Sequence, residues 1–283
     1  MDAIDSTFVS SVGKYVDRFE EMIRDYTGAK YAIATVNSTA ALHMSLLLAG
    51  VKRDKLVVTQ SLSFIATCNA ISYIGAEPLF VDVDMDTLGL SVDKLATFLK
   101  NKTEIKEGYC YHKQTWRKIS ACVPMYTFGH PVELDKIVDL CNQYQILLVE
   151  DAAESIGSTY KGKHTGTYGL FGAFSFNGNK TITCGGGVII INDEKLGKLA
   201  KHLTTQAKVP HKWEFVHDHI GYNYHLPNLN AALACAQMEM LDEFISKKRE
   251  LASAYQQFFL DKPEFHFYIE PKKVDQIIGL MLY

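Results

Sequence analysis

Residues 172–187, GAFSFNGNKTITCGGG, place one charged side chain in an apolar and glycine-rich setting. Lys180 lies between the strand-like segment 173–176 and three consecutive glycines at positions 185–187. Lysine side chains usually lie on solvated surfaces. The pattern predicts two strands, 173–176 and 187–193, joined by the loop that carries Lys180. Two interpretations of this lysine are open: it binds a phosphate group, or it is a covalent catalyst.

Outward from this loop, short β-rich runs alternate with longer helical patterns. Such alternation is typical of a mostly parallel sheet with helices on both faces, so we expect an α/β fold. The segment 100–118 is rich in lysine, and we expect a solvated insertion or a hairpin there. The other expected strands are 31–36, 56–60, 78–84, 120–127 and 146–151, and the expected helices are 39–49, 64–75, 91–100, 132–144 and a long one, open to a single break, at 228–259.

The composition argues against several classes of protein. A chain of 283 residues is long enough for one large α/β domain, and its net charge of −3 gives no electrostatic reason to expect a nucleic-acid partner. No apolar run approaches the roughly 18 residues of a membrane span. The first residues lack the features of a signal peptide, and the six cysteines are scattered without a CxxC pair. We therefore expect a cytoplasmic protein with reduced thiols.

The sequence around Lys180 does not fit a nucleotide-binding loop. A P-loop places its lysine directly after a glycine and before a helix, whereas Asn179 separates Gly178 from Lys180 and a strand is expected to follow. No G-x-G-x-x-G motif follows the first expected strand either, which argues against a dinucleotide site.

The covalent interpretation requires further groups, and the chain contains them. A lysine that binds pyridoxal phosphate covalently needs a carboxylate for the pyridine nitrogen and a cradle for the phosphate. Asp151 ends an apolar strand, and the carboxyl ends of strands are where ligands bind in open α/β sheets. Ser38 and Thr39 begin a helix directly after a strand, where free N–H groups attract a phosphate, and Ser175 adds a hydroxyl. Taken singly, Asp151 is equally compatible with a structural carboxylate, whereas Ser38 and Thr39 are more often helix caps.

The order of the motifs NSTAALH, SFIATCNAI, VEDAAESIGS, FSFNGNK and GYNYHLPNLNAAL resembles that in the sugar aminotransferases of the DegT/DnrJ/EryC1/StrS family. The resemblance covers roughly residues 10–255. It implies the large domain of a fold-type I enzyme dependent on pyridoxal phosphate, at residues 1–240. Residues 241–283 would then be the end of the long helix and the start of a small domain that is largely missing from this chain.

The resemblance also implies roles for individual residues. Lys180 is the lysine that binds the cofactor covalently, and Asp151 pairs with its ring nitrogen. Phe64 stacks on the ring, and Asn223 reaches the phosphate bound by the neighbouring subunit of a homodimer. Further cofactor contacts are implied for Ser38, Thr39, Ser175 and Glu154, and a sugar contact for His225. Phe128 and His130 follow the carboxyl end of an expected strand and are candidate sugar contacts for that reason. A structural turn is an equal alternative for Phe128 and His130.

Departures from the family pattern favour one branch of it. Glu154 stands where many members have glutamine or histidine, Gly186 where many have glutamate, and His225 where arginine is common. They favour the branch that makes 4-amino-6-deoxy sugar nucleotides, nearest to enzymes of legionaminic-acid-type pathways. The implied reaction transfers an amino group from glutamate to a keto carbon, C4, of a nucleotide-linked 6-deoxy sugar. The alternatives are a non-catalytic relative that keeps the fold and a sugar dehydratase, although the dehydratases of this family replace the lysine with histidine.

Two features remain outside this assignment. His217, Asp218 and His219 stand together, but two histidines at i and i+2 without a third ligand are a weak metal signal, so no metal site is expected. They are expected in a loop near the sugar nucleotide or the partner subunit. Without a small domain, the apolar positions of the long helix are expected to lose part of their cover: Leu241, Phe244, Ile245, Leu251, Phe258 and Phe259.

Overall fold

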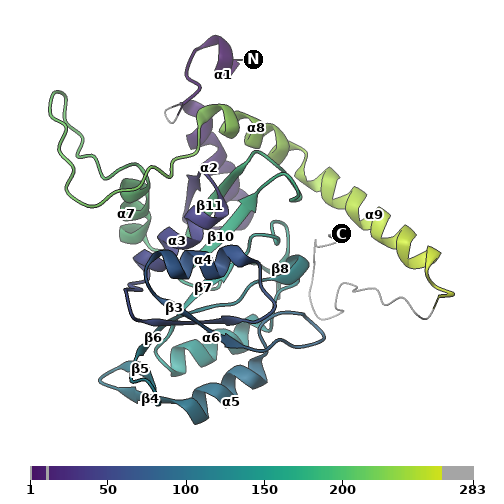
Figure 1. The fold of residues 1–283 in the computed structure, drawn as a ribbon. Helices are drawn as coiled ribbons and strands as arrows, with labels where there is room; N and C mark the ends of the chain where they lie inside the picture. Colours follow the sequence, from purple (N-terminus) through teal and green to yellow (C-terminus); the bar gives the residue numbers. More distant parts are fainter. Residues whose placement is uncertain (1, 11–12, 263–283) are drawn as a thin grey trace.

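The computed structural model describes residues 2–10 and 13–262, and its centre is one mixed sheet (Figure 1). The strand order is β1-β11-β10-β7-β6-β2-β3, in which every pair from β10 to β3 is parallel and β11 is antiparallel to both its neighbours. The strands are β1 (Tyr31–Thr35), β2 (Leu56–Gln60), β3 (Glu77–Val81), β4 (Thr103–Lys106), β5 (Tyr109–His112), β6 (Lys118–Val123), β7 (Leu147–Asp151), β8 (Thr159–Tyr160), β9 (Lys163–His164), β10 (Phe171–Phe176) and β11 (Gly186–Ile191).

Helices cover both faces of this sheet, which confirms the expected α/β fold. Side chains alternate along each strand: Phe174 belongs to the core under α2, α5, α6 and α8, and Phe171 to the core under α3, α4 and α7. In the described residues, no helix is long and apolar enough to cross a membrane. The helices are α1 (Asp2–Asp5), α2 (Lys14–Thr27), α3 (Ser38–Leu48), α4 (Ile65–Tyr73), α5 (Val92–Lys102), the 3-10 helix η1 (Thr127–Gly129), α6 (Leu134–Gln143), α7 (Glu194–Thr204), α8 (Asn228–Glu239) and α9 (Leu241–Phe258).

Several elements differ from the sequence prediction. Helices α2 and α7 were not predicted, although α2 buries Val16, Phe19 and Ile23 at helical spacing. The segment 100–118 contains the hairpin of β4 and β5. The expected strand 120–127 is shorter, because β6 ends at Val123 and η1 follows.

The C-terminal helix corrects one expectation. The long helical pattern is broken at Met240, between α8 and α9. Leu241 and Ile245 are buried by other residues of this chain, so the expected exposure of these two side chains is wrong. Leu251 and Phe258 are exposed, as expected. The segment 241–283 was expected to hold the end of the long helix and the start of a small domain, and its residues 263–283 lie outside the described residues. A domain boundary at residue 240 therefore stays a prediction.

A buried carboxylate joins the segments around the carboxyl end of β7. Glu150 is fully buried and accepts hydrogen bonds from Tyr126 Oη at 2.5 Å, Gly166 N at 2.7 Å and Gly169 N at 2.6 Å. Burial raises the pKa of Glu150, and these hydrogen bonds oppose the shift. Each donor lies in a different part of the chain from β7, so the carboxylate fixes the turn after β6 and the loop before β10 against the strand.

A close backbone approach fixes the start of α3. In β11, Gly187 pairs with Thr35 of β1 on one side and with Ser175 of β10 on the other. A Cβ at Gly187 would lie only 2.5 Å from the Asn37 carbonyl carbon and the Ser38 nitrogen. The side chain of Asn37 caps α3 by accepting a hydrogen bond from Ala40 N at 2.8 Å. Glycine at 187 thus allows the N-terminus of α3 to lie against the sheet beside Ser175.

We expect Gly187→Ala to destabilise the fold, because the added methyl group forces the start of α3 away from the sheet. Overpacking of this kind lowers the free energy of unfolding by about 1–3 kcal/mol. Gly178→Ala is the matched control, since a Cβ there meets no atom within 4 Å. Urea unfolding of both variants measures the difference. Equal stability of the two variants would show that the approach at Gly187 is not restrictive.

Candidate active site

A cavity of about 230 Å³ opens at the carboxyl ends of β7 and β10. Strand ends and a helix N-terminus meet here, as the α/β architecture predicts. The cavity is also lined by residues that the sequence did not single out, among them Met125, Asn177 and Asn179. Of the predicted site residues, it brings together Ser38, Thr39, Phe64, Asp151, Glu154, Ser175 and Lys180.

Lys180 is held in place by Glu154. The lysine lies in the loop between β10 and β11, where its backbone N donates to Asn177 O at 2.9 Å. Its Nζ lies 2.8 Å from Glu154 Oε1, and each of the two side chains is only 13% exposed. The other carboxylate oxygen, Glu154 Oε2, accepts from Phe128 N at 2.9 Å. Glu154 is therefore fixed at both oxygens and orients the ammonium group in the cavity.

Asp151 presents a buried carboxylate to the same cavity. Its Oδ2 accepts from Thr67 Oγ1 at 2.5 Å, and its Oδ1 from Ala153 N at 3.3 Å. Only 2% of the residue is exposed, and burial raises its pKa to about 6 despite the hydrogen bond from Thr67. A buried carboxylate with a raised pKa is a candidate partner for a cationic group that enters the cavity. No sequence pattern indicates the contribution of Thr67, which depends on the fold placing α4 beside the end of β7.

The N-terminus of α3 forms a polar end of the cavity. Ser38 is buried, and its Oγ has no hydrogen-bond partner among the described residues. A buried hydroxyl without a partner costs about 1–3 kcal/mol, and the first-turn N–H groups of an eleven-residue helix favour an anion at the same place. Ser175 is buried beside this turn. The donor set fits a phosphate group.

Phe64 lies at the mouth of the cavity. It precedes α4, its backbone N donates to Met125 Sδ at 3.2 Å, and the residue is 66% exposed. An exposed aromatic ring beside a cavity is available to stack on a flat ligand.

The other predicted residues do not line this cavity. Phe128 has a left-handed backbone, with φ of 55°, and contributes its N–H to Glu154, while His130 is buried. Asn223 and His225 line a separate cavity of about 380 Å³ that also includes Lys201. Sugar contacts by Phe128, His130 and His225, and a cofactor contact by Asn223, stay predictions.

The comparisons with known proteins agree with this architecture. The model of the DegT/DnrJ/EryC1/StrS aminotransferase family matches residues 1–283. The chain is 40% identical over 255 residues to the GDP-perosamine synthase of Escherichia coli O157:H7. The aligned region covers 90% of this chain and 65% of that protein. The chain thus spans about 65% of the length of this curated relative.

Two solved structures have the same fold. One is a DegT DnrJ EryC1 StrS aminotransferase from Brucella abortus, with a TM-score of 0.86, 26% identity, and coverage of 96% of this chain and 70% of that one. The other is Helicobacter pylori PseC, an aminotransferase involved in the biosynthesis of pseudoaminic acid, with a TM-score of 0.81, 25% identity, and coverage of 93% and 67%.

We expect Asp151→Asn to stabilise the protein without ligand, and only above acidic pH. The pKa of Asp151, about 6, lies above its ordinary value of 3.8, so the folded protein holds this proton more tightly than the unfolded chain. The free energy of unfolding therefore falls as pH rises from about 4 to about 6 and stays lowered above that range. Asparagine cannot ionise, so it removes the cost of burying the Asp151 charge. The free energy of unfolding should therefore rise by at most about 3 kcal/mol near pH 7.5 and stay unchanged near pH 4.

Urea unfolding at both pH values measures this gain. Asp139→Asn, at an exposed position of α6, is the matched control for the loss of one carboxylate. A destabilisation by Asp151→Asn of the same size at both pH values would contradict the assigned ionisation.

Proposed function

This chain belongs to the DegT/DnrJ/EryC1/StrS aminotransferase family, and we propose that it acts as a transaminase that uses pyridoxal 5′-phosphate. The observation that carries the proposal is the single cavity that holds the Lys180 ammonium, the buried Asp151 carboxylate and the unpartnered Ser38 hydroxyl. Amine, carboxylate and anion site are the three groups that this cofactor requires.

The residues of the cavity match the parts of the cofactor. Ser38, Thr39 and Ser175 hold the phosphate at the N-terminus of α3. Asp151 pairs with the ring nitrogen, and Phe64 stacks on the ring. When bound, the cofactor withdraws electrons from the reacting substrate carbon through its protonated ring.

Lys180 has two tasks in this proposal. It binds the cofactor covalently at rest, and as a free amine it accepts a proton from the α-carbon of the amino donor. Glu154 keeps Nζ within the cavity, because it is itself fixed by Phe128 N. In the second half of the reaction, the same Nζ handles the proton in the reverse direction.

Asp151 makes the electron withdrawal effective. Its carboxylate is expensive to ionise in this buried position, so a cationic ring nitrogen is a strongly preferred partner. Thr67 and Ala153 N orient the carboxylate without neutralising it. The aspartate thus keeps the ring nitrogen protonated at neutral pH.

We infer a sugar nucleotide as the amino acceptor. The relative from Escherichia coli is named for GDP-perosamine, and perosamine is a 4-amino-4,6-dideoxy sugar. Glu154, Gly186 and His225 depart from the usual family pattern, and these departures favour the branch that makes 4-amino-6-deoxy sugar nucleotides. The proposed reaction moves an amino group from glutamate to C4 of a nucleotide-linked 4-keto-6-deoxy sugar. A link to legionaminic-acid-type sugars is the narrower form of this proposal.

A homodimer with shared sites completes the proposal. Asn223 lies outside the Lys180 cavity of its own chain, so a contact with a bound phosphate would come from the neighbouring subunit. The loop that precedes Asn223 exposes several large apolar side chains in this chain, a feature typical of a surface that another chain covers. These are Trp213, Phe215, Val216 and Ile220.

The test of the function is turnover by the full-length protein. Incubation with glutamate and a panel of 4-keto sugar nucleotides should give an amino sugar nucleotide, detected by mass spectrometry. Lys180→Ala should lose the visible absorbance of the covalently bound cofactor, together with several orders of magnitude of turnover, because the missing step is covalent. Lys198→Ala, on the exposed face of α7, is the control and should resemble wild type.

A protein that shows the visible absorbance of the bound cofactor but transfers no amino group to any of these sugars would instead support the alternative that this chain is a non-catalytic relative. Turnover by Lys180→Ala near the wild-type rate would contradict the role of the lysine.

Mixing two inactive variants tests the shared site. If Asn223 acts on the partner, Lys180→Ala and Asn223→Ala subunits form some heterodimers with one intact site, and activity returns on mixing. Activity of the mixture is compared with that of each variant alone, with subunit exchange confirmed by mass. No recovery despite exchange would argue that each chain builds its own site.

A further inference from the structure

The segment between α7 and α8 leaves the body of the protein as a long loop and returns to its starting point (Figure 1). Hydrogen bonds close the neck of this loop: Val209 N donates to Val216 O at 2.9 Å, and Asp218 N donates to Ala207 O at 3.3 Å. The returning segment thus lies beside the residues that directly follow α7.

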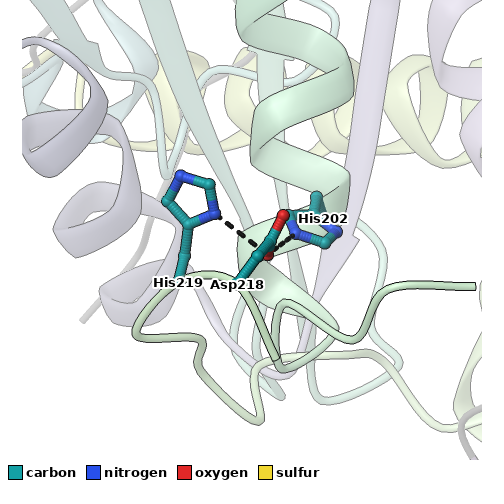
Figure 2. A group of neighbouring side chains, drawn as sticks. All are labelled: His202, Asp218 and His219. Carbon is teal, nitrogen blue, oxygen red and sulfur yellow. Dashed lines mark hydrogen bonds and ion pairs between the residues drawn. The ribbon is translucent and has the colours of Figure 1, made fainter. Parts of the chain in front are cut away.

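Three side chains converge at the neck (Figure 2). His202 Nε2, from α7, lies 2.6 Å from Asp218 Oδ1, and His219 Nδ1 lies 3.0 Å from the same oxygen. All three ligand atoms lie within 4.8 Å of one another. His217 does not join the group, because its Nδ1 is paired with Gln206 O at 2.8 Å.

The chemistry of this group suits a transition-metal ion. It offers two imidazole nitrogens and one carboxylate oxygen within 4.8 Å of one another. Imidazole nitrogens favour zinc, copper and nickel, whereas magnesium and calcium prefer oxygen ligands.

The two separations that involve the Asp218 oxygen need little adjustment. Zinc binds nitrogen and oxygen at about 2.0–2.2 Å, which places neighbouring ligand atoms of a tetrahedral site roughly 3.3 Å apart. The present separations of 2.6 and 3.0 Å therefore have to open by less than about 1 Å. His219 and Asp218 are about half exposed, and His202 is a quarter exposed, so these side chains have room to rotate.

We propose that His202, Asp218 and His219 form a binding site for one divalent transition-metal ion of the Zn²⁺ class, with water completing the coordination. None of the three residues lines the Lys180 cavity of the same chain, so the proposed ion would lie outside that cavity. A bound ion would join α7 to the loop segment that leads to Asn223. No metal site is expected from the segment 217–219 alone, because the third ligand, His202, lies 16 residues before Asp218.

Equilibrium dialysis of the full chain against Zn²⁺, after removal of metals with a chelator, tests the proposal. We expect one Zn²⁺ per chain. His202→Gln and His219→Gln should each weaken its binding at least about 10-fold, since even partners of ligands contribute that much to metal affinity. His217→Gln is the matched control and should bind as wild type does, because His217 contacts the Gln206 carbonyl oxygen instead.

Two further measurements make the result decisive. Lys180→Ala should still bind one Zn²⁺ per chain. This result would show that the ion does not depend on the lysine of the proposed cofactor cavity. In metal-free buffer, the thermal transition of each histidine variant should match that of wild type, so that lost binding does not reflect unfolding. Binding that persists in both His202→Gln and His219→Gln, or no binding by wild type, would overturn the proposal and leave a hydrogen-bonded cluster.

Discussion

The carboxylate of Glu150 constrains the chain segments that surround the candidate site. It is fully buried and accepts hydrogen bonds from Tyr126, Gly166 and Gly169, which lie after β6 and before β10. Leaving a buried acceptor without its hydrogen bond costs about 1–3 kcal/mol, and more when the acceptor is charged, so these segments are strongly held against β7. Because side chains alternate along a strand, anchoring Glu150 on one face directs Asp151 to the other face and into the cavity. The geometry of the site thus depends on a residue that does not line it.

Local patterns were sufficient to predict much of the fold and the centre of the site. The strand that ends at Asp151, the helix that begins at Ser38 and the loop of Lys180 each have a distinct signature of apolar runs, caps or glycines. The topology of an α/β sheet then brings their ends together. The same reasoning missed α2 and α7, although both have helical spacing and Asp193 caps α7. Their signals were present and were overlooked.

Other features could not be predicted, because they depend on contacts between distant residues. Thr67 donates to Asp151 across 84 positions, and Phe128 N reaches Glu154 across 26. The backbone conformation of Phe128, which directs that N–H, has no signature in its residue type. His202 likewise meets Asp218 only because the loop after α7 folds back. In each case the residue types are ordinary and the three-dimensional arrangement gives them their role.

The distribution of cysteines offers a way to observe the site directly. Five of the six thiols are buried, and Cys68 is the one that is partly accessible. It lies on α4, next to Thr67, which holds the Asp151 carboxylate. A thiol-selective fluorophore would therefore attach at Cys68 ahead of the other positions without any cysteine being removed. Burial raises the pKa of this thiol, so labelling proceeds faster in mildly alkaline buffer, where more of the reactive thiolate is present. The fluorophore would report motion of α4 beside the cavity in the otherwise native protein.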